Sequence, residues 1–121
     1  MERIYTAMIN GVNYEVFGQY WETRGSWGHR AYVLKDGSEL SQAKRRYYNR
    51  TWEAYRFQSV GEDAVSNAQA ELQRQIFDSY KWSTGAKRLT ADTKAKLLQD
   101  SPEYQALCKV MDGLRTQRRW S

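Results

Sequence analysis

The dipeptide Asn10-Gly11 constrains the fold of this chain more than any other feature of its sequence. Asn and Gly tolerate the positive φ that both central residues of a type I′ turn require, and this turn suits two antiparallel strands. Alternating runs flank the dipeptide, so a β-hairpin is predicted in which Ile9 faces Val12. Its core side carries Tyr5, Ala7, Ile9, Val12, Tyr14 and Val16, and its other side carries Thr6, Met8, Asn13 and Glu15.

One or two further strands are predicted after a long loop. Residues 18–29 hold three glycines and two tryptophans without a period, which is typical of a loop. Residues 30–35 predict a third strand that ends at the turn Asp36-Gly37, and a fourth strand follows from Gln42. Alternation in the fourth strand puts Arg46, Tyr48, Arg50 and Trp52 on one side and Arg45, Tyr47, Asn49 and Thr51 on the other.

The second half of the chain has a helical period. Apolar residues recur at three- and four-residue steps over residues 59–81, where Ser59 and Glu62 form a capping-box pattern. A start at Trp52 or Glu53 is the alternative for this helix. Thr90 and the pair Ser101-Pro102 are typical N-terminal signals, and they predict two more helices. These helices span residues 90–99 and 102–117.

The order of these elements predicts an α+β fold in a single domain over residues 1–121. Residues 1–52 are expected to be mainly strands, forming a short antiparallel sheet, and residues 53–119 mainly helices. Leu, Ile, Val and Phe are scarce, but nine Tyr and five Trp supply large apolar faces. We therefore expect a folded chain with a small, aromatic-rich core.

Composition excludes several classes of function. A single Cys and a single His, far apart, support neither a disulfide framework nor a zinc site, and no cofactor or metal is expected. No apolar run is long enough to cross a membrane, and the first residues lack the layout of a signal peptide, which predicts a cytoplasmic protein. The net charge of +5 favours an anionic partner, such as nucleic acid or an acidic protein surface.

The positive charge concentrates in two segments, residues 43–56 and residues 79–96, each with a net charge of +4. In the first segment cations alternate with aromatic rings, a pattern that holds phosphates while bases stack on the rings. The alternative is that its rings pack where the sheet meets the long helix, with the arginines stacked on them. The candidate partner-binding residues are Arg45, Arg46, Tyr48, Arg50, Trp52 and Arg56, together with Lys87 and Arg88 of the second segment.

The predicted loop supplies a second candidate surface. Trp21, Arg24 and Trp27 are of the types enriched at binding hot spots, since they exclude water over a large area and keep a polar group. The alternative is that both indoles cap the open end of the core. His29 lies nearby, but no nucleophile motif accompanies it, so no catalytic role is expected.

The run Tyr48-Asn49-Arg50-Thr51-Trp52-Glu53 resembles a motif of small phage and prophage proteins, which carry it between a short sheet and a helix. Proteins of this size from such elements include anti-CRISPR inhibitors, which block a host nuclease by occupying its nucleic-acid channel or locking its conformation. The resemblance implies a mobile-element setting within a bacterial host. Because this chain is basic, it does not suit mimicry of DNA.

Three functions are therefore weighed. The leading hypothesis is a non-enzymatic, phage-type inhibitor that binds a host protein or ribonucleoprotein complex, such as a CRISPR effector, by steric occlusion. The alternative is a stand-alone nucleic-acid-binding accessory protein of a phage or mobile element. A small nuclease is the third reading, and the carboxylates considered for it near Lys44, Glu53, Glu62 and Asp63, form a weak set.

Overall fold

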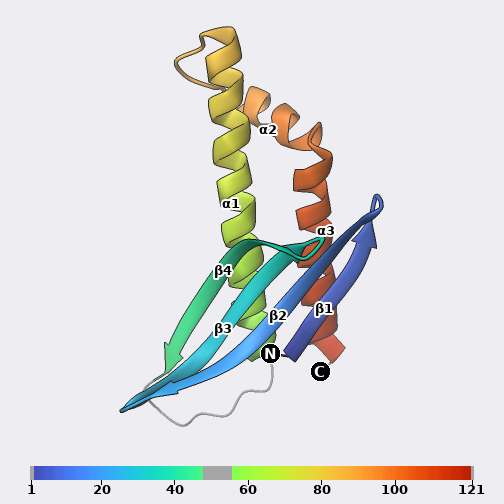
Figure 1. Ribbon diagram of the computed structural model, residues 1–121. Helices are drawn as coiled ribbons and strands as arrows, with labels where there is room; N and C mark the ends of the chain where they lie inside the picture. Colours follow the sequence, from blue (N-terminus) through green and yellow to red (C-terminus); the bar gives the residue numbers. More distant parts are fainter. Residues whose placement is uncertain (1, 48–55, 121) are drawn as a thin grey trace.

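Four strands precede three helices in the computed structural model, which describes residues 2–47 and 56–120 (Figure 1). The strands form one antiparallel sheet in the order β1-β2-β3-β4, so the predicted α+β class is confirmed. The strands are β1 (Glu2–Ile9), β2 (Val12–Thr23), β3 (Ser26–Lys35) and β4 (Ser38–Tyr47). The helices are α1 (Arg56–Thr84), α2 (Ala91–Gln99) and α3 (Pro102–Trp120).

Two of the three hairpin turns lie at the predicted dipeptides, Asn10-Gly11 and Asp36-Gly37. φ is 54° and 77° in Asn10-Gly11, and 48° and 83° in Asp36-Gly37. Positive φ at both central positions defines the type I′ geometry that closes two-residue hairpins. Ile9 pairs with Val12, as predicted. β4 begins directly after the second turn, at Ser38, and therefore earlier than its predicted start.

The predicted long loop over residues 18–29 is wrong. β2 continues to Thr23 and β3 begins at Ser26, and these two residues pair across a tight turn. Gly25 in that turn has a φ of 85°, which glycine adopts without strain. Both strands contain glycine, which is uncommon in strands because it has no side chain to pack. The sequence of this segment therefore does not indicate an extended conformation.

The capping box predicted at the start of the long helix is also wrong. α1 begins at Arg56, so Ser59 lies within the first turn and cannot be the N-cap that pairs with Glu62. The predicted continuation of the fourth strand to Trp52, and the alternative helix starts at Trp52 or Glu53, lie outside the described residues.

The predicted N-caps of α2 and α3 are confirmed. The Oγ1 atom of Thr90 accepts a hydrogen bond of 3.2 Å from the backbone N–H of Thr93, and α2 follows. The Oγ atom of Ser101 accepts one of 3.2 Å from the backbone N–H of Tyr104. α3 starts at Pro102, whose missing N–H costs nothing in a first turn.

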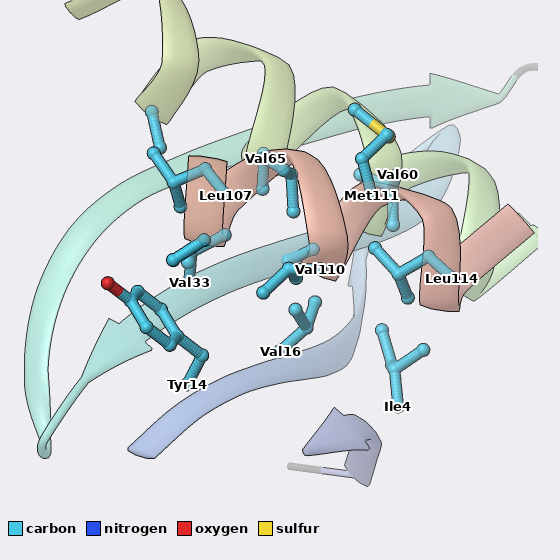
Figure 2. Close-up of a cluster of buried hydrophobic side chains, with 14 residues drawn as sticks. Ile4, Tyr14, Val16, Val33, Val60, Val65, Leu107, Val110, Met111 and Leu114 are labelled. Carbon is cyan, nitrogen blue, oxygen red and sulfur yellow. The ribbon is translucent and has the colours of Figure 1, made fainter. Parts of the chain in front are cut away.

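The core lies between α1, α3 and one face of the sheet (Figure 2). Its largest fully buried side chains are Val16 and Val33 from the sheet, Val60 and Val65 from α1, and Val110 and Leu114 from α3. On the predicted core side of the first hairpin, only Tyr14 and Val16 are buried. Ile4 is buried as well, because the pairing of β1 with β2 shifts between Arg3 and Tyr5.

The opposite face of the sheet carries neither of the two helices that pack against the strands (Figure 1). Side chains alternate between the faces of a strand, so the register of β2, β3 and β4 determines which residues share this open face. It carries Glu15, Phe17, Gln19 and Trp21 from β2, Gly28, Arg30, Tyr32 and Leu34 from β3, and Glu39, Gln42, Lys44 and Arg46 from β4.

Candidate functional site

Trp21 on the open face packs against the backbone of β3 at Gly28, the residue that pairs with it. A Cβ atom added at Gly28 would lie 2.6 Å from Cζ2 of Trp21 and 1.9 Å from the carbonyl oxygen of Arg45. Only glycine leaves this space. The absence of a side chain on β3 lets the indole of β2 reach toward β4.

Two cations of β4 lie over this indole. The Nζ atom of Lys44 is 4.2 Å from the centroid of the Trp21 ring, and the Cζ atom of Arg46 is 5.4 Å from it. Both distances fall within the range of attractive cation–π contacts. Lys44 and Arg46 are exposed, so the indole orders two charges that still face solvent.

A third cation lies beside this pair. Arg30 pairs with Lys44 in the register of the sheet, and its Nη1 atom donates a hydrogen bond of 3.3 Å to the hydroxyl of Tyr32. That hydroxyl donates in turn to Oε1 of Gln19, at 3.4 Å. We call the set Gln19, Trp21, Arg30, Tyr32, Lys44 and Arg46 the cationic sheet face. It holds three positive charges and no carboxylate.

A shallow hollow of about 350 Å³ adjoins the cationic sheet face. The rings of Phe17 and Tyr32 line it, and Arg3 lies over the Phe17 ring, with Cζ 6.0 Å from the centroid. The other lining residues are Gln19, Leu34 and Glu39. The open face therefore combines aromatic rings and cations within neighbouring rows of the sheet.

Arg45 faces the other side of β4 from Lys44 and Arg46. Its Nη2 atom donates to Oδ1 of Asp63 on α1 at 3.1 Å, and its Nε atom donates to Oδ2. This two-point contact is the geometry in which guanidinium and carboxylate groups pair best. Arg45 fastens β4 to α1 and lies apart from the cationic sheet face.

The two indoles of the predicted loop lie on opposite faces of the sheet. Trp27 shares the helix side with Tyr20 and His29, and its ring centroid is 5.8 Å from that of His29, which is 8% exposed. Trp27 therefore packs against Tyr20 and His29, whereas Trp21 belongs to the open face. Arg24 is exposed in the turn between β2 and β3.

Lys87 and Arg88 of the second charged segment are not part of this surface. Lys87 and Arg88 are exposed between α1 and α2, at the opposite end of the molecule from the turn between β2 and β3 (Figure 1). Arg56 is the first residue of α1. Three more candidates lie outside the described residues, namely Tyr48, Arg50 and Trp52.

Sequence reasoning missed Gln19, Arg30 and Tyr32. Their signal is the alternation of β2 and β3, which becomes visible once Arg24-Gly25 is placed in a two-residue turn. Trp82 near the end of α1 was missed as well. It lies off the apolar stripe of the helix and is 91% exposed, which is rare for so large an apolar side chain.

Two of the carboxylates considered for a nuclease, Glu62 and Asp63, are separated from Lys44, and the third, Glu53, lies outside the described residues. Asp63 is paired with Arg45 on the helix side of β4, and Oε1 of Glu62 lies 3.7 Å from Nε of Arg115. Within residues 2–47 and 56–120, no three His, Cys, Asp or Glu residues form a group that could hold a metal ion. None of the described helices is long and apolar enough to span a membrane.

No family model matches the chain, and no curated protein or solved structure matches it either.

Proposed function

We propose that this protein binds nucleic acid through the cationic sheet face and catalyses no reaction. The observation that carries the proposal is the cluster in which Trp21 orders Lys44 and Arg46 beside Arg30, without a carboxylate among them. Clustered cations on one face attract the phosphate backbone, which dominates the affinity of proteins for nucleic acids.

The arrangement of the cations supports the proposal beyond their number. A flexible Lys or Arg side chain loses rotamer freedom when it binds a phosphate, and that loss weakens binding. Here the Trp21 ring restricts Lys44 and Arg46, and the Tyr32 hydroxyl restricts Arg30. Part of the entropy that these side chains would lose on binding is thus already lost in the free protein.

The salt dependence of binding tests this function. Each phosphate neutralised on a single strand contributes about 0.7 to the negative slope of log affinity against log salt, so three cations give a slope of roughly −2. We expect fluorescence anisotropy with a labelled oligonucleotide to show this slope. The double variant Lys44→Ala, Arg46→Ala should bind several-fold more weakly and with a shallower slope.

A matched control is available at the other end of the molecule. The double variant Lys87→Ala, Arg88→Ala removes the same charge from exposed positions outside the cationic sheet face. It should bind as the unmodified protein does. Equal losses in the two double variants would mean that overall charge, and not this surface, attracts the nucleic acid, and the proposal would then be rejected.

Inhibition of a host defence complex is the second candidate function, and the exposed Trp82 favours it. Trp is the residue most enriched at the centres of protein interfaces, and Trp82 is 91% exposed at the helical end of the molecule, where Lys87 and Arg88 follow it in sequence. An inhibitor of a CRISPR effector in the bacterial cytoplasm would contact protein at this end, while the cationic sheet face contacts guide or target nucleic acid.

Gel filtration of the protein with a purified CRISPR effector tests this second function. A complex should form with the unmodified chain and weaken at least tenfold with Trp82→Ala, since hot-spot residues contribute about 2 kcal/mol or more. The matched control is Trp82→Phe, which keeps an aromatic ring. If no effector forms a complex that survives gel filtration, this candidate is rejected and nucleic-acid binding alone remains.

A further inference from the structure

The hollow beside the cationic sheet face is lined by two aromatic rings and by polar side chains, a chemistry that suits one flat, aromatic group. Phe17 and Tyr32 are neighbours in the register of β2 and β3, so both rings stand on the same row of the open face. Both are half-buried, and they line a volume of about 350 Å³. Flat aromatic walls of this kind stack with nucleobases.

The hollow is bordered by a carboxylate, whereas the neighbouring row of the open face carries cations. Glu39 lines the hollow, and a carboxylate repels a phosphate but accepts hydrogen bonds from the amino groups of bases. Gln19 also lines the hollow and carries an amide that can bond a base edge. Gln19, Arg30 and Lys44 form the next row of the open face. This row lies about 7 Å along the strands from the row of Phe17 and Tyr32.

We propose that the hollow lined by Phe17 and Tyr32 receives one unpaired base, while Arg30 and Lys44 hold the adjoining phosphates, so that the protein selects single strands over duplexes. This inference rests on the proposed function, because it specifies the form of nucleic acid that the cationic sheet face binds. In a duplex the faces of the bases are stacked on their neighbours, so no base can enter the hollow without being flipped out.

An abasic oligonucleotide separates the inference from the function on which it rests. It carries the same phosphates as an ordinary single strand and lacks the bases, so it retains the contacts to the cations and loses stacking. We expect the ordinary strand to bind roughly 5- to 100-fold more tightly than the abasic strand or the matched duplex, as is usual for one stacked base. The salt slopes of the ordinary and abasic strands should be equal.

Two variants at one position identify the ring responsible. Tyr32→Ala removes the ring and should reduce the affinity for the ordinary strand to that for the abasic strand. Tyr32→Phe removes only the hydroxyl that contacts Arg30 and Gln19, and it should keep the preference for the ordinary strand. Thermal unfolding of both variants checks that the sheet is intact.

The outcomes are distinguishable. Equal affinity of the unmodified protein for ordinary, abasic and duplex oligonucleotides overturns the inference and leaves the proposed function standing. Absence of binding to all three overturns both. Because these comparisons use only the unmodified protein, the inference stays testable even if Tyr32→Ala fails to fold.

Discussion

The ammonium nitrogen of Lys44 on β4 lies 4.2 Å from the ring centroid of Trp21 on β2, so the two residues meet across the strand between them. Side chains on strands that are not neighbours seldom meet over a filled row, since a side chain on the middle strand separates them. Gly28, which pairs with Trp21 and with Arg46, leaves the row of Trp21 empty, so the indole can reach Lys44 on the adjacent row. This contact spanning three strands assembles the cationic sheet face.

Removing the indole should disorganise the cations without removing charge. Trp21→Ala deletes two cation–π contacts, each worth about 0.5–1 kcal/mol at exposed sites. We expect an affinity for single-stranded oligonucleotides that is about fivefold lower, with a nearly unchanged salt slope, measured by anisotropy. Trp21→Phe keeps a ring and should lose less. A Trp21→Ala protein of unaltered affinity would show that the indole does not order the cations.

Adding a single methyl group at Gly28 should destabilise the fold. In Gly28→Ala the new Cβ would lie 1.9 Å from the backbone carbonyl oxygen of Arg45, which cannot rotate away as a side chain can. We expect a loss of about 1–3 kcal/mol in the free energy of unfolding, as for other overpacked sites, measured by urea denaturation.

The double variant Gly28→Ala, Trp21→Ala distinguishes the two close contacts. Removing the indole relieves one of them and leaves the backbone contact with Arg45, so it should not restore stability. Full recovery in the double variant would contradict the account of Gly28 as a position fixed by the approach of β4.

Arg45 and Arg46 are neighbours in sequence and should behave differently. Arg45→Ala removes the ion pair with Asp63. The side chain of Arg45 is 45% exposed and that of Asp63 is 39% exposed. Pairs with this much exposure contribute about 0.2–1 kcal/mol to stability, so thermal unfolding should change slightly and oligonucleotide binding little. Arg46→Ala should show the reverse, with weaker binding and unchanged stability. Equal effects of the two substitutions on binding would contradict the assignment of opposite faces.

Stability should depend on the ionisation of Tyr14 at alkaline pH. Burial raises the pKa of the Tyr14 phenol above its ordinary value of 10.0; the nearby Lys35 lowers it less, and Glu103 and Asp36 add to the increase. The folded state therefore keeps this proton to a higher pH than the unfolded state. Its contribution is complete below about pH 10 and is lost as pH rises through the folded pKa.

Tyr14→Phe provides the comparison for this effect, because it keeps the ring and cannot ionise. The unmodified protein should lose stability relative to Tyr14→Phe as pH rises from about 9 to about 11, measured by urea denaturation at each pH. A constant difference between the two proteins over this interval would show that the phenol titrates alike in the folded and unfolded states.

Local signals predicted most of the fold. Asn10-Gly11 and Asp36-Gly37 determine their turns through their own backbone preferences, and Thr90 and Ser101 cap helices through bonds to residues three positions away. Arg24-Gly25 was missed because only its second residue has positive φ, so the pair lacks the pattern of a type I′ turn.

The candidate site was predicted in fragments. Trp21 and Arg46 were each selected as binding residues, but assigning them to one surface requires the register of β2, β3 and β4. The role of Gly28 is likewise invisible locally, since the atoms that forbid a side chain there come from other strands. Long-range pairing, and not local preference, therefore decides which of the aromatic residues are available to a partner.

Because side chains alternate between the two faces of β2, β3 and β4, the residues of these strands form two sets, one on each face of the sheet. One set, exemplified by Val16 and Val33, packs against the helices, so substitutions there destabilise the fold. The other set, exemplified by Arg30 and Lys44, borders only solvent and its own neighbours. Apart from Gly28, every second residue along these strands can thus change, and with it the chemistry of the open face, while the architecture that displays those residues is inherited intact.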